Sequence, residues 1–292
     1  MVALQTLGGV TMKRINDSGF SNYLTLHRVA PKTKEAYLHA INGISSYHNL
    51  PPDRLNNDQI QEYLRHAIQE RQLSWSSCNV LFCGLKKYYR DYLRCNESDF
   101  SIPPRPRSRK LPLLLSRKEV DRILDNAGNL KHRALLANVY GSGLRVSEVV
   151  KLRPEHIDSP RMMIRVEQAK GRKDRYTVLS KTGLELLRDY WRQYHPSQWL
   201  FPGRNKNNYM SVSTAQQIYK RAKMKAGVTK GKGIHTLRHC FATHLLDQGV
   251  DLVTIKRWLG HTALKTTCRY LHASPEHLSR IKSPLDFEEV QI

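Results

Sequence analysis

A segment rich in proline and basic residues divides this chain into two parts. Residues 96–112 read NESDFSIPPRPRSRKLP, in which four prolines alternate with the basic residues Arg105, Arg107, Arg109 and Lys110. Proline fixes the backbone φ angle and lacks an N–H donor, so this segment cannot form a helix interior or a central strand. We therefore predict two domains, residues 1–98 and 113–275, joined by a linker at 99–112.

The first part has the apolar spacing of a helical bundle. Apolar residues recur at helical spacing over 31–47, 58–71 and 75–94, and a further helix is expected around 20–28. The polar positions of the segment 75–94 include Lys86, Lys87 and Arg90, which lie either on a solvated helix face or against a bound partner. We predict an all-α domain at residues 1–98.

The second part mixes helices with two short strands. Ser116 and Glu119 have the spacing of a capping box, and further helices are expected at 130–140, 181–194 and 213–226. Between them, residues 162–180 predict two strands joined by a polar turn that contains Lys170, Arg172 and Lys173. The predicted fold class is therefore mainly α with a small antiparallel β-sheet in the second domain, an α+β arrangement.

The densest group of reactive side chains lies near the C-terminal end, at residues 234–273. This stretch predicts three short helices, of which the first two are each followed by a glycine, a residue that commonly ends a helix. A tyrosine hydroxyl has a pKa of about 10, so near neutral pH it attacks phosphorus only beside a base or in a strongly positive site. The stretch holds a candidate nucleophile with such partners: His235, Arg238, His239, His261 and Tyr270.

Each of these residues also has a simpler interpretation. His235 and His239 are four residues apart, which is the spacing of two metal ligands on one helix face. The sequence offers no third ligand at a zinc spacing and no carboxylate cluster typical of a Mg²⁺ site, so we expect no metal and no cofactor. His261 could be a histidine that responds to a helix terminus, and Tyr270 could be a packing residue.

The charge of the chain indicates a polyanionic partner. There are 48 Lys and Arg residues against 25 Asp and Glu, a formal net charge of +23. Such an excess favours nucleic acid, because each neutralised phosphate releases counterions. No apolar run approaches the ~18 residues that span a bilayer, the N-terminus does not have the order of a signal peptide, and the five cysteines form no CxxC pair. We expect a cytoplasmic, nucleoid-associated protein without a membrane partner.

Four separated motifs then occur in a fixed order: GSGLRVSEVVKL at 141–152, AKGRKDRYTVL at 169–179, HTLRHCFATHLL at 235–246 and LGHTALKTTCRY at 259–270. Together they resemble the tyrosine recombinase family of the phage-integrase and Xer type, over roughly residues 110–275. The resemblance implies a core-binding, SAM-like, DNA-binding domain at 1–98, a catalytic domain at 113–275 and a C-terminal tail at 276–292 that is exchanged between subunits.

The resemblance also implies a role for each matching residue. The two arginines of the motifs hold the scissile phosphate, Lys170 protonates the leaving 5′ oxygen, and one histidine assists removal of the proton from the nucleophile while the other bonds the phosphate. In the order of the chain the catalytic set is Arg145, Lys170, His235 (proton removal), Arg238, His261 (phosphate) and Tyr270 (nucleophile). Glu148 and His239 resemble residues that hold the arginines. Lys173 is the alternative to Lys170 as the general acid.

The implied function is site-specific recombination. The enzyme would cut and rejoin duplex DNA through a 3′-phosphotyrosine intermediate, without metal or ATP, and exchange strands through a Holliday junction. A dimer would bind each site and a homotetramer would form on synapsed DNA. We expect DNA contacts, beyond the catalytic set, from these basic residues: Lys86, Lys87, Arg90, Arg105, Arg107, Arg109, Lys110, Arg172 and Lys173.

Two other functions remain open at this point. A type IB topoisomerase would share the chemistry but relax supercoiled DNA as a monomer and without a specific site. A non-catalytic DNA-binding protein on the same scaffold would have lost catalytic positions, and none of the six is lost in this sequence.

Overall fold

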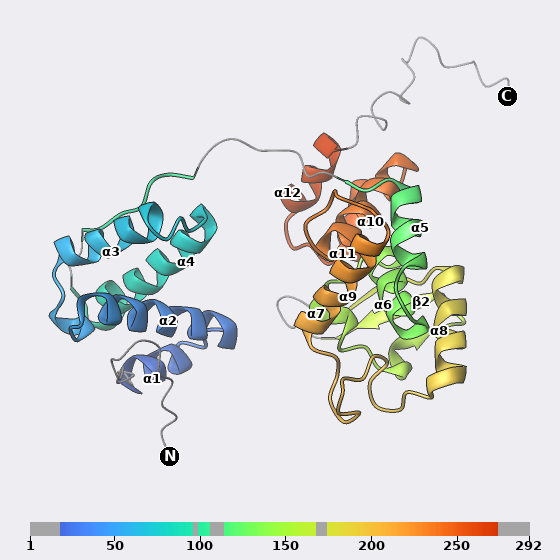
Figure 1. Cartoon of the computed structure of the whole chain (residues 1–292), viewed down its shortest axis with the longest axis horizontal. Coiled ribbons are helices and arrows are strands. Elements are labelled where there is room, and N and C mark those ends of the chain that lie inside the picture. The colour runs from blue at the N-terminus through green and yellow to red at the C-terminus, as the bar shows by residue number, and fades with distance from the viewer. Residues whose placement is uncertain (1–17, 96–98, 106–113, 168–173, 274–292) are drawn as a thin grey trace, which may run out of the picture. The chain divides into compact units, whose positions relative to one another are not determined.

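The chain forms two compact units, Met1–Arg109 and Lys110–Ile292, and their division falls within the predicted linker. The computed structural model describes residues 18–95, 99–105, 114–167 and 174–273 (Figure 1). Among these residues no helix has both the length and the apolar character needed to cross a bilayer. The prediction of a mainly α fold with a small antiparallel sheet is confirmed.

The first unit is all-helical, as its apolar spacing predicts. Its core is built from large apolar side chains that are almost completely buried, such as Phe20, Ile44 and Leu85. The last predicted helix, 75–94, is divided into an α-helical part and a π-helical turn. The elements are α1 (Ser18–Leu26), α2 (Pro31–His48), the 3₁₀ turn η1 (Pro52–Arg54), α3 (Asn57–Gln69), α4 (Trp75–Lys86) and the π-helical turn η2 (Lys87–Tyr92).

The first residues of the predicted linker pack against this unit. Phe100 is buried in its core, and Ser101 exchanges two backbone hydrogen bonds with the Gln61 side chain, at 2.9 and 3.1 Å. Trp75 donates from Nε1 to the carbonyl oxygen of Pro103 at 2.9 Å, and the guanidinium of Arg105 lies over the Trp75 ring. Arg107, Arg109 and Lys110 lie outside the described residues.

The second unit surrounds a small sheet with helices. The three strands pair antiparallel in the order β1-β2-β3, and Val166 on β2 lies opposite Arg175 on β3. The sequence did not predict β1, which is only two residues long. The elements are α5 (Arg117–Asp125), α6 (Leu130–Gly141), α7 (Val146–Val149), η3 (Pro154–His156), β1 (Ile157–Asp158), β2 (Met163–Val166), β3 (Arg175–Val178), α8 (Lys181–Tyr194), α9 (Val212–Lys225), α10 (His235–Asp247), α11 (Leu252–Leu259), α12 (Leu264–Thr267) and the 3₁₀ turn η4 (Cys268–Ala273).

The predicted helix ends agree closely with the structure in this unit. The Ser116 side chain accepts from the Glu119 N–H, and the Glu119 carboxylate accepts from the Ser116 N–H, so the predicted capping box begins α5. Gly260 adopts a left-handed conformation and ends α11. The third helix predicted in 234–273 is α12, and Tyr270 lies on the turn η4 that follows it.

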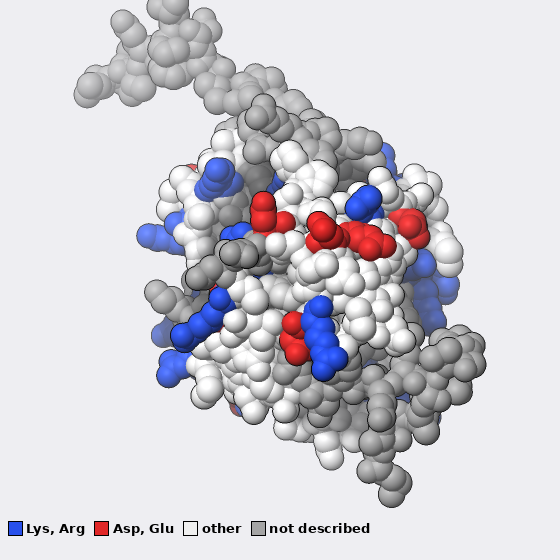
Figure 2. Space-filling model, turned by 90° about the vertical axis from the view of Figure 1, so that its left-hand side faces the viewer, with Lys and Arg blue, Asp and Glu red and all other residues white. Residues whose placement is uncertain are grey.

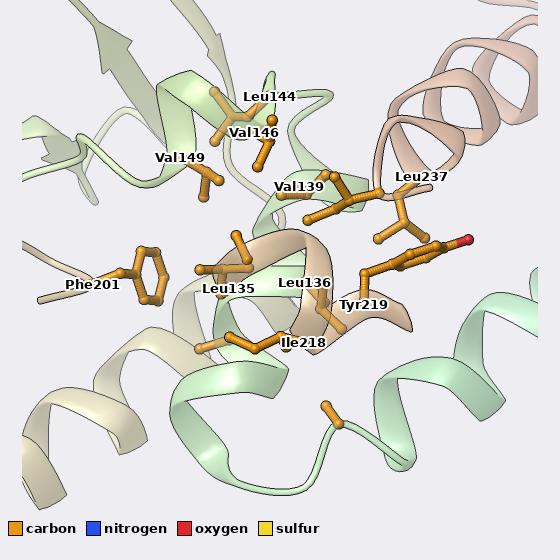
Figure 3. Packing of buried hydrophobic residues seen from close by; sticks show 14 of the residues in the cluster. Leu135, Leu136, Val139, Leu144, Val146, Val149, Phe201, Ile218, Tyr219 and Leu237 are labelled. Atoms are coloured by element: carbon orange, nitrogen blue, oxygen red, sulfur yellow. The ribbon is translucent and has the colours of Figure 1, made fainter. Parts of the chain in front are cut away.

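Helix α10 packs against α6, α11 and η4 in the second unit. Figure 3 shows Leu237 of α10 beside Val139 of α6 and Tyr219 of α9, and Leu237 is completely buried. Further along α10, Phe241 belongs to a second apolar cluster, with α11 and Tyr270. Because α10 is packed on two sides, its rotation is fixed, and the side chains between these contacts have defined positions.

The turn between α6 and α7 brings the backbone close to α10. Gly143 has a φ of +60°, and a Cβ atom added there would lie 2.4 Å from Cδ1 of Phe241. Only glycine avoids both the left-handed strain and this clash. The turn leads directly into α7, so this close approach fixes the position of α7 relative to α10.

We predict that Gly143→Ala lowers the free energy of unfolding by about 2–4 kcal/mol, from left-handed strain and overpacking together. Gly227 is the matched control, because it has a φ of +65° but no atom within 4 Å of an added Cβ. Gly227→Ala should cost only about 1 kcal/mol. Urea unfolding followed by tryptophan fluorescence measures the difference, since three of the 4 tryptophans lie in the second unit. Equal effects of the two substitutions would contradict this account.

Candidate active site

The centre of the site is a carboxylate among three arginines. Glu148 lies on α7 and its side chain is only 8% exposed. Its Oε1 accepts from Arg145 Nη1 at 2.7 Å and from Arg175 Nη1 at 2.9 Å, and its Oε2 accepts from Arg175 Nη2 at 2.8 Å. Arg238 Nη1 lies 3.6 Å from Oε2. The three guanidinium groups and the one carboxylate leave a surplus of two positive charges in a largely buried place.

The arginines keep this carboxylate ionised despite its burial. Burial alone raises the pKa of Glu148, but the hydrogen bonds and charge of Arg175, together with the bonds from Arg145, outweigh it and bring the pKa to about 2. For Arg238, burial and the neighbouring Arg145 charge lower the pKa to about 10, so it still carries its proton near neutral pH. The cluster is therefore fully charged under physiological conditions.

The same arginines bind the C-terminal end of α11. Arg175 Nε donates to the carbonyl oxygen of Trp258 at 3.0 Å, Arg238 Nη2 donates to that of Leu259 at 2.5 Å, and Arg145 Nη2 donates to that of Gly260 at 3.4 Å. The last carbonyls of a helix have no partner within the helix and carry its partial negative charge. Three consecutive carbonyl groups are thus satisfied by three different arginines.

Tyr270 lies beside this cluster with its hydroxyl against a histidine. Its side chain is buried, with 5% exposed, and its hydroxyl is 3.1 Å from Nδ1 of His239. The ring of His261 is stacked on it, with centroids 6.4 Å apart and planes 14° apart. In the His239 tautomer that is protonated at Nε2, Nδ1 accepts the hydroxyl proton. A proton acceptor for the phenol is therefore in direct contact.

The contacts of His261 define its tautomer. Arg238 Nη2 lies 3.3 Å from His261 Nε2, and because arginine can only donate, Nε2 accepts this bond. The proton of the neutral ring is then on Nδ1, which donates to Thr267 Oγ1 at 3.0 Å. His261 therefore joins Arg238 to α12, the short helix that precedes Tyr270.

His235 lies one helical turn before His239 on α10. It is exposed, and its ring centroid is 6.5 Å from that of His239. Partial desolvation and the charges of Arg238 and Arg145 lower its pKa, so the neutral form is favoured near neutral pH. A neutral imidazole at this position can accept a proton.

The structure brings together most of the residues that the sequence singled out. Lys170, Arg172 and Lys173 lie outside the described residues. Seven predicted residues, from three motifs that are far apart in the chain, surround the end of α11 or the neighbouring turn of α10: Arg145, Glu148, His235, Arg238, His239, His261 and Tyr270.

The predicted DNA-contacting residues of the first unit have different surroundings. Lys86 and Arg90 are exposed, whereas Lys87 forms an ion pair with Asp91 at 2.7 Å and lies over the Tyr23 ring. Figure 2 shows acidic and basic side chains interspersed on the face of the first unit that is turned to the viewer.

Arg175 was missed by the sequence analysis. It lies within the motif AKGRKDRYTVL, which was noted for its lysines, and arginine at a strand end next to several other basic residues is normally a surface residue. Its side chain is only 10% exposed. The one signal available was its position immediately before the second predicted strand, where an inward-facing charge requires a partner.

No metal site accompanies these groups in the described ranges. Within residues 18–95, 99–105, 114–167 and 174–273, no three His, Cys, Asp or Glu side chains lie together in a way that could hold an ion. His235 and His239, the pair with metal-ligand spacing, lie beside guanidinium groups, whose positive charge opposes cation binding.

Comparison with known proteins identifies the family. Residues 114–277 match the phage integrase family, and residues 18–97 match the N-terminal SAM-like domain of phage integrases. The chain belongs to the phage integrase family. It is a tyrosine-type site-specific recombinase, as its relatives indicate. A proposed integrase/recombinase of Sinorhizobium fredii is 37% identical over 255 residues, covering 87% of this chain and 83% of the relative. The tyrosine recombinase XerA of Thermococcus kodakarensis is 33% identical over 267 residues, covering 89% and 92%.

Solved structures share the fold of the recombinase. The crystal structure of a XerA recombinase aligns with a TM-score of 0.54 at 26% identity and covers 91% of this chain and 98% of that one. The integrase of the transposon Tn1549, in complex with a circular intermediate DNA, aligns with a TM-score of 0.69 at 16% identity and covers 86% and 93%. The prediction of the family from four short motifs is confirmed.

We predict that Glu148→Gln destabilises the recombinase by about 3 kcal/mol at neutral pH, because buried arginines lose their counter-charge. The pKa of Glu148 is depressed to about 2, so its contribution is present above its unfolded pKa and is lost as the pH falls from about 4.5 toward 2. The stability gap between the wild type and Glu148→Gln should therefore narrow over that range.

Urea unfolding at several pH values measures the gap. Glu155→Gln is the control, since Glu155 is 62% exposed and pairs with Arg153 at 3.3 Å; it should cost less than about 1 kcal/mol. A gap that is as small for Glu148→Gln as for Glu155→Gln at neutral pH would contradict the role of Glu148.

Proposed function

We propose that this recombinase cuts and rejoins duplex DNA at specific sites through a covalent 3′-phosphotyrosine at Tyr270. The observation that carries the proposal is the contact between the Tyr270 hydroxyl and His239, beside a buried group of arginines. A packing tyrosine needs neither an imidazole at its hydroxyl nor a positive surplus next to it. A nucleophile that attacks a phosphodiester needs both.

The arginines supply the phosphate-binding charge. Arg145 and Arg238 would hold the scissile phosphate, since a planar guanidinium can bind two phosphate oxygens at once. A phosphodiester carries one negative charge and its five-coordinate transition state carries about two. The surplus of two positive charges around Glu148 matches the transition state better than the ground state, and this difference lowers the barrier.

The geometry favours His239 as the first acceptor of the tyrosine proton. The sequence had suggested His235 for this step and His239 as a support for the arginines. His239 Nδ1 is 3.1 Å from the hydroxyl, whereas His235 lies one turn earlier on the helix, with its ring centroid 6.5 Å from that of His239. In the proposed step the Tyr270 oxygen bonds to phosphorus and its proton passes to His239.

The same step breaks the bond between phosphorus and the 5′ oxygen. Lys170 would donate a proton to this leaving oxygen. His261 would donate from Nε2 to a phosphate oxygen once Arg238 has turned from Nε2 to the phosphate and the ring has changed to the Nε2–H tautomer, in which the Thr267 hydroxyl donates to Nδ1. The free energy of the phosphodiester is retained in the phosphotyrosine, so a second 5′ hydroxyl can reverse the reaction on a new strand without ATP. No step of this scheme requires a metal ion or a cofactor.

The partner would be double-stranded DNA with specific recombination sites. Support comes from the net charge of +23 and from fold neighbours solved with DNA, such as a XerH recombinase bound to a difH substrate. Lys86, Arg90 and Arg105 would provide contacts from the SAM-like first unit. We further propose a dimer on each site, a homotetramer on synapsed DNA, Holliday-junction exchange and a tail at 276–292 that binds a neighbouring subunit. Recombination would take place in the cytoplasm, on nucleoid DNA.

We predict that Tyr270→Phe binds DNA as the wild type does but forms no covalent adduct. The substrate is a set of fragments from the DNA that flanks the gene of this protein, and adducts are trapped with denaturing detergent and mapped. An adduct that survives in Tyr270→Phe would reject the assignment of the nucleophile. Relaxation of any supercoiled plasmid by a monomer, without a preferred site, would instead support the topoisomerase alternative.

A modified substrate distinguishes Lys170 from Lys173 as the acid. When sulfur replaces the 5′ bridging oxygen, the leaving group is a weaker base and departs without a donated proton. Lys170→Ala should slow cleavage of ordinary DNA by at least about 100-fold and cleave the sulfur substrate at nearly the wild-type rate. Lys173→Ala should show no such rescue. The reverse pattern would assign the acid to Lys173.

A further inference from the structure

We propose that Arg175 is a positioning residue of the recombinase, which locks Glu148 to the C-terminal end of α11 and thereby orients the phosphate-binding arginines before DNA arrives. This inference rests on the proposed function of Arg145 and Arg238. Arg175 itself would not touch the phosphate.

All three nitrogen positions of Arg175 are engaged in this connection. Nη1 and Nη2 donate to the two oxygens of Glu148 at 2.9 and 2.8 Å, and Nε donates to the carbonyl oxygen of Trp258 at 3.0 Å. The rigid fork of a guanidinium fixes both the position and the rotation of the carboxylate. With 10% of its side chain exposed, Arg175 is too enclosed to be an ordinary surface contact for DNA.

Arg175 also connects elements that are far apart in the sequence. It is the first residue of β3, it binds Glu148 on α7, and it binds α11, which packs against β3. The proposed acid, Lys170, precedes it by five residues in the motif that leads into β3. A substitution of Arg175 therefore acts on β3, α7 and the end of α11 at once.

The end of α11 is shaped around this side chain. Gly260 has a φ of +61°, and an added Cβ would lie 2.7 Å from Cδ of Arg175. The carbonyl group of Gly260 accepts from Arg145 at 3.4 Å, and its neighbour Leu259 accepts from Arg238. The backbone that receives the two phosphate-binding arginines is thus in direct contact with Arg175.

Without Arg175, the carboxylate would lose its two-armed partner and the Trp258 carbonyl would lose its donor. Glu148 would keep its bonds from the Arg145 backbone N–H and Nη1, at 2.8 and 2.7 Å, but would lose its connection to the end of α11. Arg145 and Arg238 would therefore keep their charges but not their fixed positions relative to one another. A displacement of about 1 Å at a reacting centre lowers a rate by about 100-fold. The substitution of Arg175 should therefore lower the rate of DNA cleavage and not the affinity for DNA.

The test compares Arg175→Met and Arg175→Lys with Arg161→Met. Arg161 is 77% exposed and pairs with Asp158 at 3.4 Å, so its substitution removes the same charge outside the site. The substrate is the DNA on which the wild type forms its adduct, and single-turnover cleavage and DNA affinity are both measured. Arg175→Met should slow cleavage by about 100-fold and change the affinity by no more than Arg161→Met does. Arg175→Lys should recover to within about tenfold of the wild-type rate, because it restores the charge without the fork.

A second readout requires no DNA. NMR of ¹⁵N-labelled guanidinium groups reports the hydrogen bonds of Arg145 and Arg238 in the free protein. Both signals should shift in Arg175→Lys. This variant also provides the test if Arg175→Met does not fold. Unchanged signals and cleavage as fast as in Arg161→Met would overturn the positioning role. If the wild type forms no adduct on any fragment, the proposed function fails, while the NMR result still decides whether Arg175 orients the cluster.

Discussion

The network of hydrogen bonds and ion pairs around the Glu148 carboxylate is the interaction on which the rest of the site depends. Three guanidinium groups this close repel one another, and an enclosed place screens that repulsion poorly. One carboxylate that is 8% exposed offsets part of the repulsion and keeps a surplus of two positive charges. Replacing Glu148 by an apolar residue would leave the repulsion between the arginines without compensation, and a second carboxylate would halve the positive surplus. Under the proposed function, the number of charges fits both the negative charge of a phosphate transition state and the cost of burying unpaired charges.

The C-terminal end of α11 converts this charge cluster into a defined geometry. The carbonyl groups of its last two residues and of its C-cap, Gly260, each accept from a different arginine, so the helix end serves as a template for the spacing of the arginines. The backbone continues directly into His261, whose ring joins Arg238 to Thr267, and then into Tyr270. The proposed phosphate-binding arginines and the proposed nucleophile are therefore positioned by one continuous segment of the chain. Helix α10, held on two sides by Leu237 and Phe241, adds His239 from the opposite direction.

The sequence predicted the two-part organisation, most of the helices and the family, because these depend on local spacing and on motifs of several residues. It did not predict β1, which has two residues and no measurable period, or the π-helical turn after Lys86, where packing overrides helical propensity. The position of Arg175 and the contact of His239 with Tyr270 could not be predicted from the sequence for another reason. A side chain's partner across 27 or 31 residues depends on tertiary packing, and no spacing rule contains that information. The motifs indicate which residues gather, whereas the contacts between these residues depend on the tertiary structure.

The central claim is that a phosphate-binding site is already assembled in the DNA-free protein. Titration with inorganic vanadate, which adopts the five-coordinate geometry of a phosphoryl-transfer transition state, tests it most directly, with binding followed by ⁵¹V NMR. The account predicts one saturable site per chain in the wild type, and loss of that site in Arg238→Met when the variant is shown to be folded. Equal binding by the wild type and folded Arg238→Met, or no binding by either, would contradict it.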